Sequence, residues 1–434
     1  MTKRIVYIIT CILALPFTGK AQEMLTLEDA IGKALEYNYD IRIVKNEARQ
    51  AAVNNTLGNA GFSPNINANG GISTGTSNTR IEFADGRVQE VPNAASFGIN
   101  GAVTLNWTLF DGGRMFIVKK QLNVLERLGE ARLKEQVQAT VSQVIQAYAA
   151  SVWQKQQGVA IDTGLVLAQV RMMLSQVKYE TGASAKIDYL QARVDYNSRR
   201  ADSLSQLASL NASFATLNAL MGEDPDKTYI LEDTLHSDMD LEPSDKQRFE
   251  QMNPSLEAAR RSVEAYELGA KIARTYHLPT LAVNGAYNYT RTRSQSGFAL
   301  FNQSYGPQGS AAISVPIFQG GNIRRQAKIA SLQAMREQLV YDRQNTEIGR
   351  QYRTAWRNYE VAVAAYKLEQ ENIGYAKENM DIQKARFRVG IATTLETREA
   401  ENSYVQALVR LYTAAYNLKV NETIVLQLEG TLVK

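Results

Sequence analysis

The sequence predicts an α+β protein that is built twice from one unit, each unit combining a β-hairpin with long antiparallel helices. Three observations predict this class: short motifs that recur at a fixed distance, two long stretches without proline, and segments of alternating polarity ahead of each stretch. Hydrophobic residues are 44% and charged residues 21% of the 434-residue chain, a composition typical of folded protein rather than disorder.

The first residues have the pattern of a secretory signal peptide, expected over 1–21. Lys3 and Arg4 give a basic start, an apolar run covers 5–15, and small residues precede a cleavage site after Ala21. The apolar run is too short to cross a bilayer as a helix. The sequence therefore predicts an exported protein.

Removal of this segment changes the charge and the redox chemistry of the chain. The only cysteine, Cys11, leaves with it, so no disulfide is expected. The formal charge of +4 falls to about +1, which argues against a nucleic-acid partner. We expect no later segment with the roughly 20 apolar residues of a membrane helix. A membrane would then be crossed by β-strands.

The chain repeats itself at a constant distance. Pro64 and Pro279 match at a distance of 215 positions, which confines the difference in length between the copies to one loop. Three further motif pairs lie 208 positions apart: LFDGGR at 109–114 with IFQGGN at 317–322, YETG at 179–182 with FRVG at 387–390, and LMG at 220–222 with LEG at 428–430.

Proline is absent from two stretches, after Pro92 up to Pro225 and after Pro316. Because proline disrupts helix interiors, both stretches are free to be helical. Apolar residues at helical spacing predict long helices over about 113–181 and 321–388, each roughly 100 Å long. Shorter helices are expected over about 26–60, 186–221 and 395–428, and the first long helix could bend at Gly158 and Gly164.

Alternating polarity predicts β-hairpins over about 62–110 and 279–318, with surface loops at about 75–96 and 292–308. A half-buried sheet in a soluble protein would alternate in the same way. However, the polar positions carry Asn and Thr rather than Lys and Glu, and strands of about ten residues suit an outer-membrane barrel. Four strands cannot close a barrel, so several chains would have to share one.

These features divide the chain into four parts. We expect a signal peptide, a first repeat, a linker containing Pro225 and Pro243, and a second repeat, over residues 1–21, 22–222, 223–250 and 251–434.

The motifs TLFDGGR and VPIFQGGN, together with the signal peptide, the duplication and the long helices, resemble the TolC-like outer membrane factor family over essentially the whole mature chain. The resemblance implies a homotrimeric channel-tunnel, with four strands per chain in a shared 12-stranded barrel and a tunnel of coiled helices in the periplasm. It also implies an outer-membrane exit duct for efflux or type I secretion, working in outer-membrane lipid with a periplasmic adaptor (membrane fusion) protein and an inner-membrane pump of RND, ABC or MFS type.

The resemblance also assigns roles to particular residues. Glu396 and Glu399, at i and i+3 on one helix face, match positions that line the constricted entrance, usually as aspartates. Here glutamate replaces aspartate and both Arg398 and Arg388 lie nearby, so such a ring would be wider or partly neutralised by salt bridges. Asp188, the equivalent of Glu396 in the first copy, matches a position that helps hold the tip closed.

Two further residue sets follow from the same resemblance. The helical tips would contact the adaptor through Tyr179, Gly182, Phe387 and Gly390. The strand-to-helix swivels would be Asp111, Gly112, Gly113, Gln319, Gly320 and Gly321.

Nothing in the sequence favours an enzyme. His236 and His277 lie in unlike segments without the spacing of a zinc site, and no nucleophile elbow or phosphate-binding loop occurs. We therefore expect no cofactor and no metal. A non-conducting periplasmic coiled-coil scaffold or adhesion protein is the alternative to a conduit, and the four alternating strands argue against it.

Overall fold

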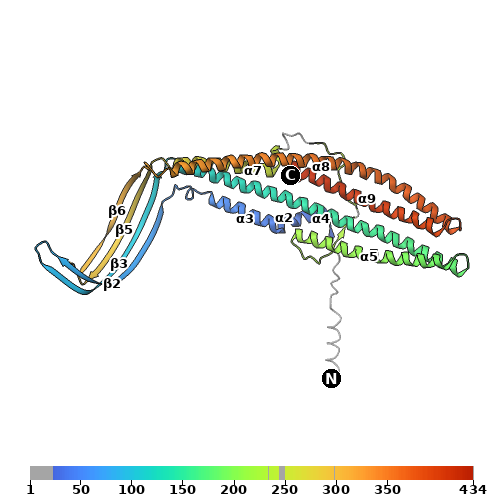
Figure 1. Cartoon of the computed structure of the whole chain (residues 1–434), viewed down its shortest axis with the longest axis horizontal. Helices are drawn as coiled ribbons and strands as arrows, with labels where there is room; N and C mark the ends of the chain where they lie inside the picture. The colour runs from blue at the N-terminus through green and yellow to red at the C-terminus, as the bar shows by residue number, and fades with distance from the viewer. Residues whose placement is uncertain (1–22, 233, 244–249, 298, 434) are drawn as a thin grey trace, which may run out of the picture. The chain divides into compact units, whose positions relative to one another are not determined.

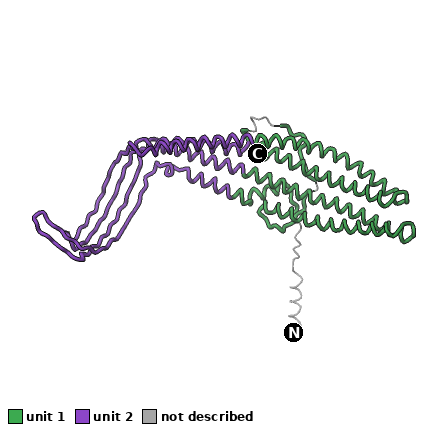
Figure 2. Tube along the Cα trace, in the orientation of Figure 1, with its two compact units in different colours: residues 1–42, 136–252, 348–434 green, residues 43–135, 253–347 purple. Residues whose placement is uncertain are grey.

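The computed structural model describes residues 23–232, 234–243, 250–297 and 299–433, so the expected signal peptide and parts of the linker lie outside the described residues. The chain divides into two compact units, unit 1 (1–42, 136–252 and 348–434) and unit 2 (43–135 and 253–347) (Figure 2). The elements (Figure 1) are β1 (Met24–Leu25), α2 (Leu27–Tyr37), α3 (Tyr39–Asn54), β2 (Asn65–Glu82), β3 (Val88–Phe110), α4 (Arg114–Glu180), α5 (Lys186–Met221), β4 (Ile230–Leu231), α7 (Pro254–Thr275), β5 (Thr280–Ser294), β6 (Phe301–Ser314), α8 (Asn322–Arg388) and α9 (Thr394–Glu429).

Unit 2 contains a four-stranded antiparallel sheet in the order β2-β3-β5-β6. One row across it pairs Gly70 with Gly101, Gly101 with Tyr289, and Tyr289 with Tyr305. Side chains alternate between the two faces of the sheet along each strand, and the register aligns this alternation across all four strands. One face is therefore apolar and the other polar. The apolar face carries Ile66, Ala68, Ile72, Phe97, Ile99, Val103, Leu105, Trp107, Leu281, Val283, Tyr287, Tyr289, Tyr305, Ala311 and Ile313.

The opposite face of the sheet is polar and uncharged. It carries only Asn, Gln, Ser, Thr, Gly and Ala along 65–73, 98–108, 282–292 and 302–314. Strands β2 and β6 lie at the two edges, so each has one row of backbone hydrogen-bonding groups without a partner inside this sheet. The sheet is therefore open at both edges.

The expected loops over 75–96 and 292–308 are wrong. The strands continue through most of these residues, with the first hairpin closing over 83–87. The segments are rich in Ser, Thr and Asn, which are typical of turns, yet these side chains lie exposed on paired extended backbone. At the other end, β6 stops at Ser314, before Pro316 removes a backbone donor.

Helices α4 and α8 each have 67 residues, and α5 and α9 each have 36. The expected bends at Gly158 and Gly164 do not interrupt α4, which stays α-helical through both. A Cβ at Gly164 would lie 3.3 Å from a side-chain carbon of Val405. The missing side chain thus allows close packing with α9.

One stretch of α4 contradicts the expectation about membrane helices. Among the described helices, only α4 contains an 18-residue window that is long and apolar enough to cross a membrane, with a mean hydropathy of 1.2. About a third of that window is buried. A core helix of a soluble protein passes the same test, so this window alone does not identify a membrane span.

The expected single helix over 26–60 is also wrong, because Asn38 divides it. The Asn38 backbone ends α2, and its side-chain oxygen accepts hydrogen bonds from the backbone N–H groups of Asp40 and Ile41. The amide of the same side chain donates to the carbonyl of Leu220 at 2.9 Å. Asn253, which lies 215 positions later, caps α7 in the same way through Ser255 and Leu256. A buried asparagine at a helix start therefore occurs at equivalent places in both halves.

Unit 1 is held together near its middle by a short parallel strand pair. Met24 pairs with Ile230 and Leu25 with Leu231, which brings the start of the described chain against β4. The hydroxyl of the buried Tyr148 donates to the carbonyl of Leu25 at 3.1 Å. This pair completes a core formed by Leu25, Ala30, Ala34, Val144, Tyr148, Val152, Phe214, Leu217, Met221, Tyr229 and Leu231.

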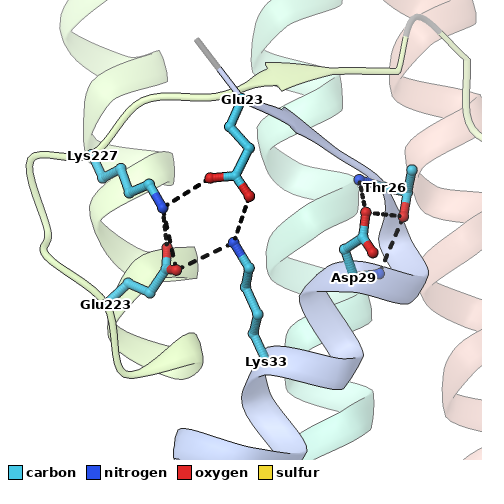
Figure 3. Close-up of polar contacts among 6 residues, drawn as sticks. All are labelled: Glu23, Thr26, Asp29, Lys33, Glu223 and Lys227. Carbon is cyan, nitrogen blue, oxygen red and sulfur yellow. Dashed lines mark hydrogen bonds and ion pairs between the residues drawn. The ribbon is translucent and has the colours of Figure 1, made fainter. Parts of the chain in front are cut away.

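A closed ring of alternating charges joins the same segments (Figure 3). Lys33 pairs with Glu23 at 3.3 Å and with Glu223 at 3.2 Å, and Lys227 pairs with Glu23 at 3.1 Å and with Glu223 at 3.3 Å. Both lysines also lie over the Tyr229 ring. The hydrogen bonds from both lysines lower the pKa of Glu23. Beside the ring, Thr26 and Asp29 form the capping box of α2 (Figure 3).

Candidate functional site

The two helical tips of unit 1, at the ends of α4 and α8, have the same backbone turn. In the first tip, the N–H of Gly182 donates to Tyr179 O at 3.0 Å and the N–H of Ala183 to Lys178 O at 2.7 Å. In the second, Gly390 donates to Phe387 O at 3.2 Å and Ile391 to Arg386 O at 2.9 Å. This is a Schellman motif, which ends a helix at a residue with positive φ. Gly182 has φ +75° and Gly390 has φ +81°.

The helices that leave the two tips begin differently. Thr393 caps α9 as a capping box, because its hydroxyl accepts from the N–H of Glu396 while the Glu396 carboxylate accepts from both the N–H and the hydroxyl of Thr393. These hydrogen bonds, first that from the Thr393 backbone, lower the pKa of Glu396. The carboxylate is exposed and stays ionised.

The first tip has no such cap. Ala185 stands at the N-cap of α5 and offers no side-chain hydrogen bond to the helix. Asp188 occupies the position equivalent to Glu396, is half-buried, and follows a turn in which its own N–H donates to Ala185 O at 3.1 Å. Glu399, one turn beyond Glu396 on α9, is exposed. The structure thus places two candidate gate carboxylates in the first turns of α9 and the third in the first turn of α5.

The two tips contact each other through Lys178 and Phe387. The Lys178 ammonium donates to the Phe387 carbonyl at 3.0 Å and lies 3.8 Å from the centroid of the Phe387 ring. The cation therefore sits at the negative end of the α8 dipole and over an aromatic face. Phe387 is buried, whereas Tyr179 is exposed and stacks on Tyr189 of α5 with ring centroids 6.4 Å apart.

Further from the tips, a buried ionic cluster joins α4 and α5 to α9. The Arg171 guanidinium binds the Glu401 carboxylate through Nη1 and the Asp195 carboxylate through Nη2, the latter at 3.1 Å. Arg398 lies 3.7 Å from the same Asp195 oxygen. Arg171 is 4% and Glu401 5% exposed, so this pair is shielded from water. Nearby, Arg199 of α5 donates to Asn402 of α9 at 2.6 Å.

Burial raises the pKa of Glu401 to about 7, although the positive charge of Arg171 acts in the opposite direction. Weaker attraction from Lys384 and Arg199 also lowers the pKa, and Asp195 raises it. Glu401 therefore changes its charge near neutral pH. Sequence reasoning missed this cluster, because Arg171 and Glu401 are separated by 230 positions.

The strand-to-helix junctions of unit 2 also differ between the halves. Gly112 and Gly113 have φ of +73° and +81°, and Gly320 and Gly321 of +57° and +72°. The buried Asp111 carboxylate accepts from the N–H of Met115 and binds Arg114 at 3.1 Å, whereas a Cβ at Gly112 would lie 2.5 Å from the Cβ of Leu278. In the second junction Gln319 is exposed, and its carbonyl accepts from the N–H of Asn322 at 3.0 Å.

Within the part of the chain that the structure describes, no group of three or more His, Cys, Asp or Glu side chains is arranged to hold a metal ion. The tips and junctions offer charge, helix capping and apolar contact.

Comparison with known proteins identifies relatives of this architecture. A family model described as "Outer membrane efflux protein" matches residues 30–223 and 247–431. Outer membrane protein TolC of Escherichia coli (strain K12) is 24% identical over 191 residues, which is 42% of this chain and 39% of that protein. The match to TolC of Vibrio cholerae covers 43% of that protein, so the chain spans about two fifths of the length of these two relatives. Outer membrane efflux protein BepC of Brucella suis biovar 1 is 22% identical over 96% of this chain and 87% of its own length.

Solved structures share the fold at low sequence identity. The Campylobacter jejuni CmeC outer membrane channel has a TM-score of 0.78 at 17% identity, covering 94% of this chain and 86% of CmeC. The open state of the Neisseria gonorrhoeae MtrE outer membrane channel has a TM-score of 0.69 at 17% identity, covering 94% and 89%.

Proposed function

Because the chain belongs to the outer membrane efflux protein family, we propose that it is the outer-membrane exit duct of a tripartite efflux or type I secretion system. In this role it is a passive conduit and not an enzyme. The observation that supports this most is the unit 2 sheet, which has one continuous apolar face and one uncharged polar face. The apolar face suits lipid and the polar face suits a water-filled channel. The scaffold alternative gives no reason for this division.

The working form is a homotrimer with a shared 12-stranded barrel. Unpaired strand edges are not tolerated in lipid, and here both β2 and β6 are edges. Since neighbours in the sheet are antiparallel, β6 of one copy can pair antiparallel with β2 of the next and continue the pattern. Three copies give 12 strands, the number that the family resemblance implies. The internal duplication then places two hairpins of each chain around one axis, with the glycine pairs at 112–113 and 320–321 as swivels.

A lining of Asn, Ser and Thr with no charged side chain binds no particular cargo strongly. Such a wall offers hydrogen bonds to many solutes and sets no electrostatic barrier to either sign of charge. Transport energy then comes from an inner-membrane pump of RND, ABC or MFS type, since a passive conduit supplies none. A periplasmic adaptor connects the two.

The tips are the surface for that adaptor. Their turns expose apolar side chains around Gly182 and Gly390, with exposed fractions of 70% for Val389, 69% for Ile391 and 58% for Ile187. Apolar groups exposed together mark sites of protein contact.

Glu396 and Glu399, with Asp188 at the other tip, form the acidic gate, in which three copies bring together six glutamate carboxylates.

Single-channel current in a planar bilayer tests the conduit and the gate together. We expect small, cation-selective openings that divalent ions reduce, and larger openings with less divalent sensitivity in Glu396→Ala/Glu399→Ala. The control Glu371→Ala/Glu378→Ala removes two exposed carboxylates of α8 outside the tips and should conduct like the wild type. Equal currents in all three proteins would contradict the gate. Absence of current after confirmed insertion would contradict the conduit.

A further inference from the structure

We propose that Arg291 and Arg293 of β5 form a binding site for the phosphate groups of a phosphorylated glycolipid, lipid A being the chemical type. The inference rests on the proposed outer-membrane location. It starts from the register of the sheet, which places both arginines on the same face as Leu281, Val283, Tyr287 and Tyr289. On β5 the apolar face therefore ends in two cations, whose strand partners on β3 are Ile99 and Phe97.

The position of the arginines along the strand matches a membrane interface. Arg291 lies ten positions after Leu281, which is at the helix end of the face. At about 3.3 Å per residue and a tilt of about 40°, this corresponds to a height of about 25 Å, the height of the apolar band of outer-membrane barrels. Tyr289 of β5 and Tyr305 of β6 pair in the row just below, where an aromatic girdle belongs. The guanidinium groups then lie at the level of lipid headgroups.

Other basic residues at this end of the sheet are already neutralised. Arg80 pairs with Glu90 at 3.1 Å and Arg87 with Asp85 at 2.8 Å. Within the described part of the chain, Arg291 and Arg293 have no carboxylate at ion-pair distance. Like charges two residues apart on one strand face repel each other, so this pair is stabilised by an anion between them.

The ring of Phe301 holds the two arginines together. Phe301 is the strand partner of Arg293 on β6, and the guanidinium carbons of Arg291 and Arg293 lie 5.4 and 5.9 Å from its centroid. Cation–π contact with one ring orients both groups without using their charge in an ion pair. Their N–H donors remain available, and planar guanidinium groups bind phosphate oxygens in pairs. Ile99 of β3 lies in the same row as Arg291, and Tyr289 and Tyr305 lie in the row below, so these side chains offer apolar surface to acyl chains.

The experiment measures binding of bisphosphorylated lipid A to the full-length protein in a non-ionic detergent. We expect about tenfold or greater weakening in Arg291→Gln/Arg293→Gln, because charge-assisted hydrogen bonds to phosphate are lost. The matched control Arg80→Gln/Arg87→Gln removes two arginines that have carboxylate partners and should bind within about twofold of the wild type. Arg291→Lys/Arg293→Lys keeps the charge and should recover part of the affinity.

Three results would overturn the proposal: equal binding by the glutamine variant and the wild type, an equal loss in the control, or unchanged affinity for dephosphorylated lipid A. Displacement of the lipid by millimolar inorganic phosphate would make this a site for free anions instead. If the glutamine variant does not fold, the lysine variant and the dephosphorylated lipid still decide the matter. If the wild type conducts in a bilayer and the glutamine variant binds lipid A as well as the wild type, the binding site is rejected and the conduit stands. If the wild type inserts and carries no current, the conduit itself is rejected.

Discussion

The two helical tips of unit 1 share a turn but differ in what stabilises the helix beyond it. Gly182 and Gly390 end their helices with the same Schellman hydrogen bonds. After the turn, Thr393 and Glu396 cap α9 reciprocally, whereas Ala185 gives α5 no side-chain cap. The N-terminus of α5 therefore lacks the side-chain cap that stabilises the N-terminus of α9. We infer that α5 depends more on tertiary contacts, above all on the Arg171 cluster, which binds Asp195 of α5.

Removing the centre of this cluster should have the largest effect. Arg171→Met leaves the buried Glu401 without its counter-charge, and at pH 8, where Glu401 of the wild type is ionised, loss of one partner of a buried pair costs up to about 3–5 kcal/mol. We expect the free energy of local unfolding, measured by amide hydrogen exchange in α5 and α9, to fall by that amount. The double variant Arg171→Met/Glu401→Leu removes both charges and should recover most of the loss. An unchanged exchange rate in the single variant would show that the cluster does not hold α5.

The pH dependence of the same region should follow Glu401. The folded pKa of about 7 lies above the ordinary glutamate pKa of 4.5, so between these pH values the folded protein holds a proton that the unfolded chain has released. The contribution of Glu401 to stability is therefore fully present below pH 4.5 and is lost as the pH rises through 7, by up to about 3 kcal/mol.

Glu401→Gln keeps the shape of the side chain and cannot ionise. Its thermal stability between pH 4.5 and 8 should vary less than that of the wild type. If the two proteins gave parallel curves, Glu401 would not be the group that titrates.

The cap at the second tip allows a smaller test. Thr393→Ala removes the hydroxyl that accepts from Glu396 N–H and should destabilise the start of α9 by about 1 kcal/mol. Amide exchange in the first turn of α9 measures this, and Thr393→Ser, which keeps the hydroxyl, is the control. A similar loss in the serine variant would assign the effect to the methyl group.

The reverse change at the first tip should give the smallest effect. Ala185→Thr places threonine three residues before Asp188, which reproduces the capping box of Thr26 with Asp29 in α2. We expect slower exchange in the first turn of α5, by about 0.5–1 kcal/mol. Ala185→Val, which has the same branching without a hydroxyl, should give no gain. Equal stabilisation by both variants would indicate packing rather than capping.

The sequence alone was sufficient to predict the long helices, because helix formation depends on residues that are close together in the chain. Absence of proline and helical spacing led to long helices, and α5 begins and ends at the expected Lys186 and Met221. The family resemblance is confirmed by the match to the outer membrane efflux protein model. The strand ends were missed because Ser, Thr and Asn favour turns locally but also suit an exposed, fully paired hairpin.

Features that depend on distant residues were not visible. Asn38 interrupts a helical pattern because its side chain reaches Leu220, 182 positions away. In the sequence, Arg171 is one of many charged residues in a predicted helix. Its ion pair with Glu401 exists only because α9 packs against α4. The gate and adaptor roles of the tip residues remain predictions, since each copy of the chain contributes only part of such a site.

The β1–β4 pair also sets an order on folding. Met24 and Ile230 are 206 positions apart in the sequence, so their pairing closes a long loop and raises the contact order of unit 1. The core around Leu25 cannot be completed until the residues after α5 are available. We therefore expect the β1–β4 pair to form only after the segment that follows α5 is in place, and a chain that stops before Ile230 lacks the strand partner of Met24.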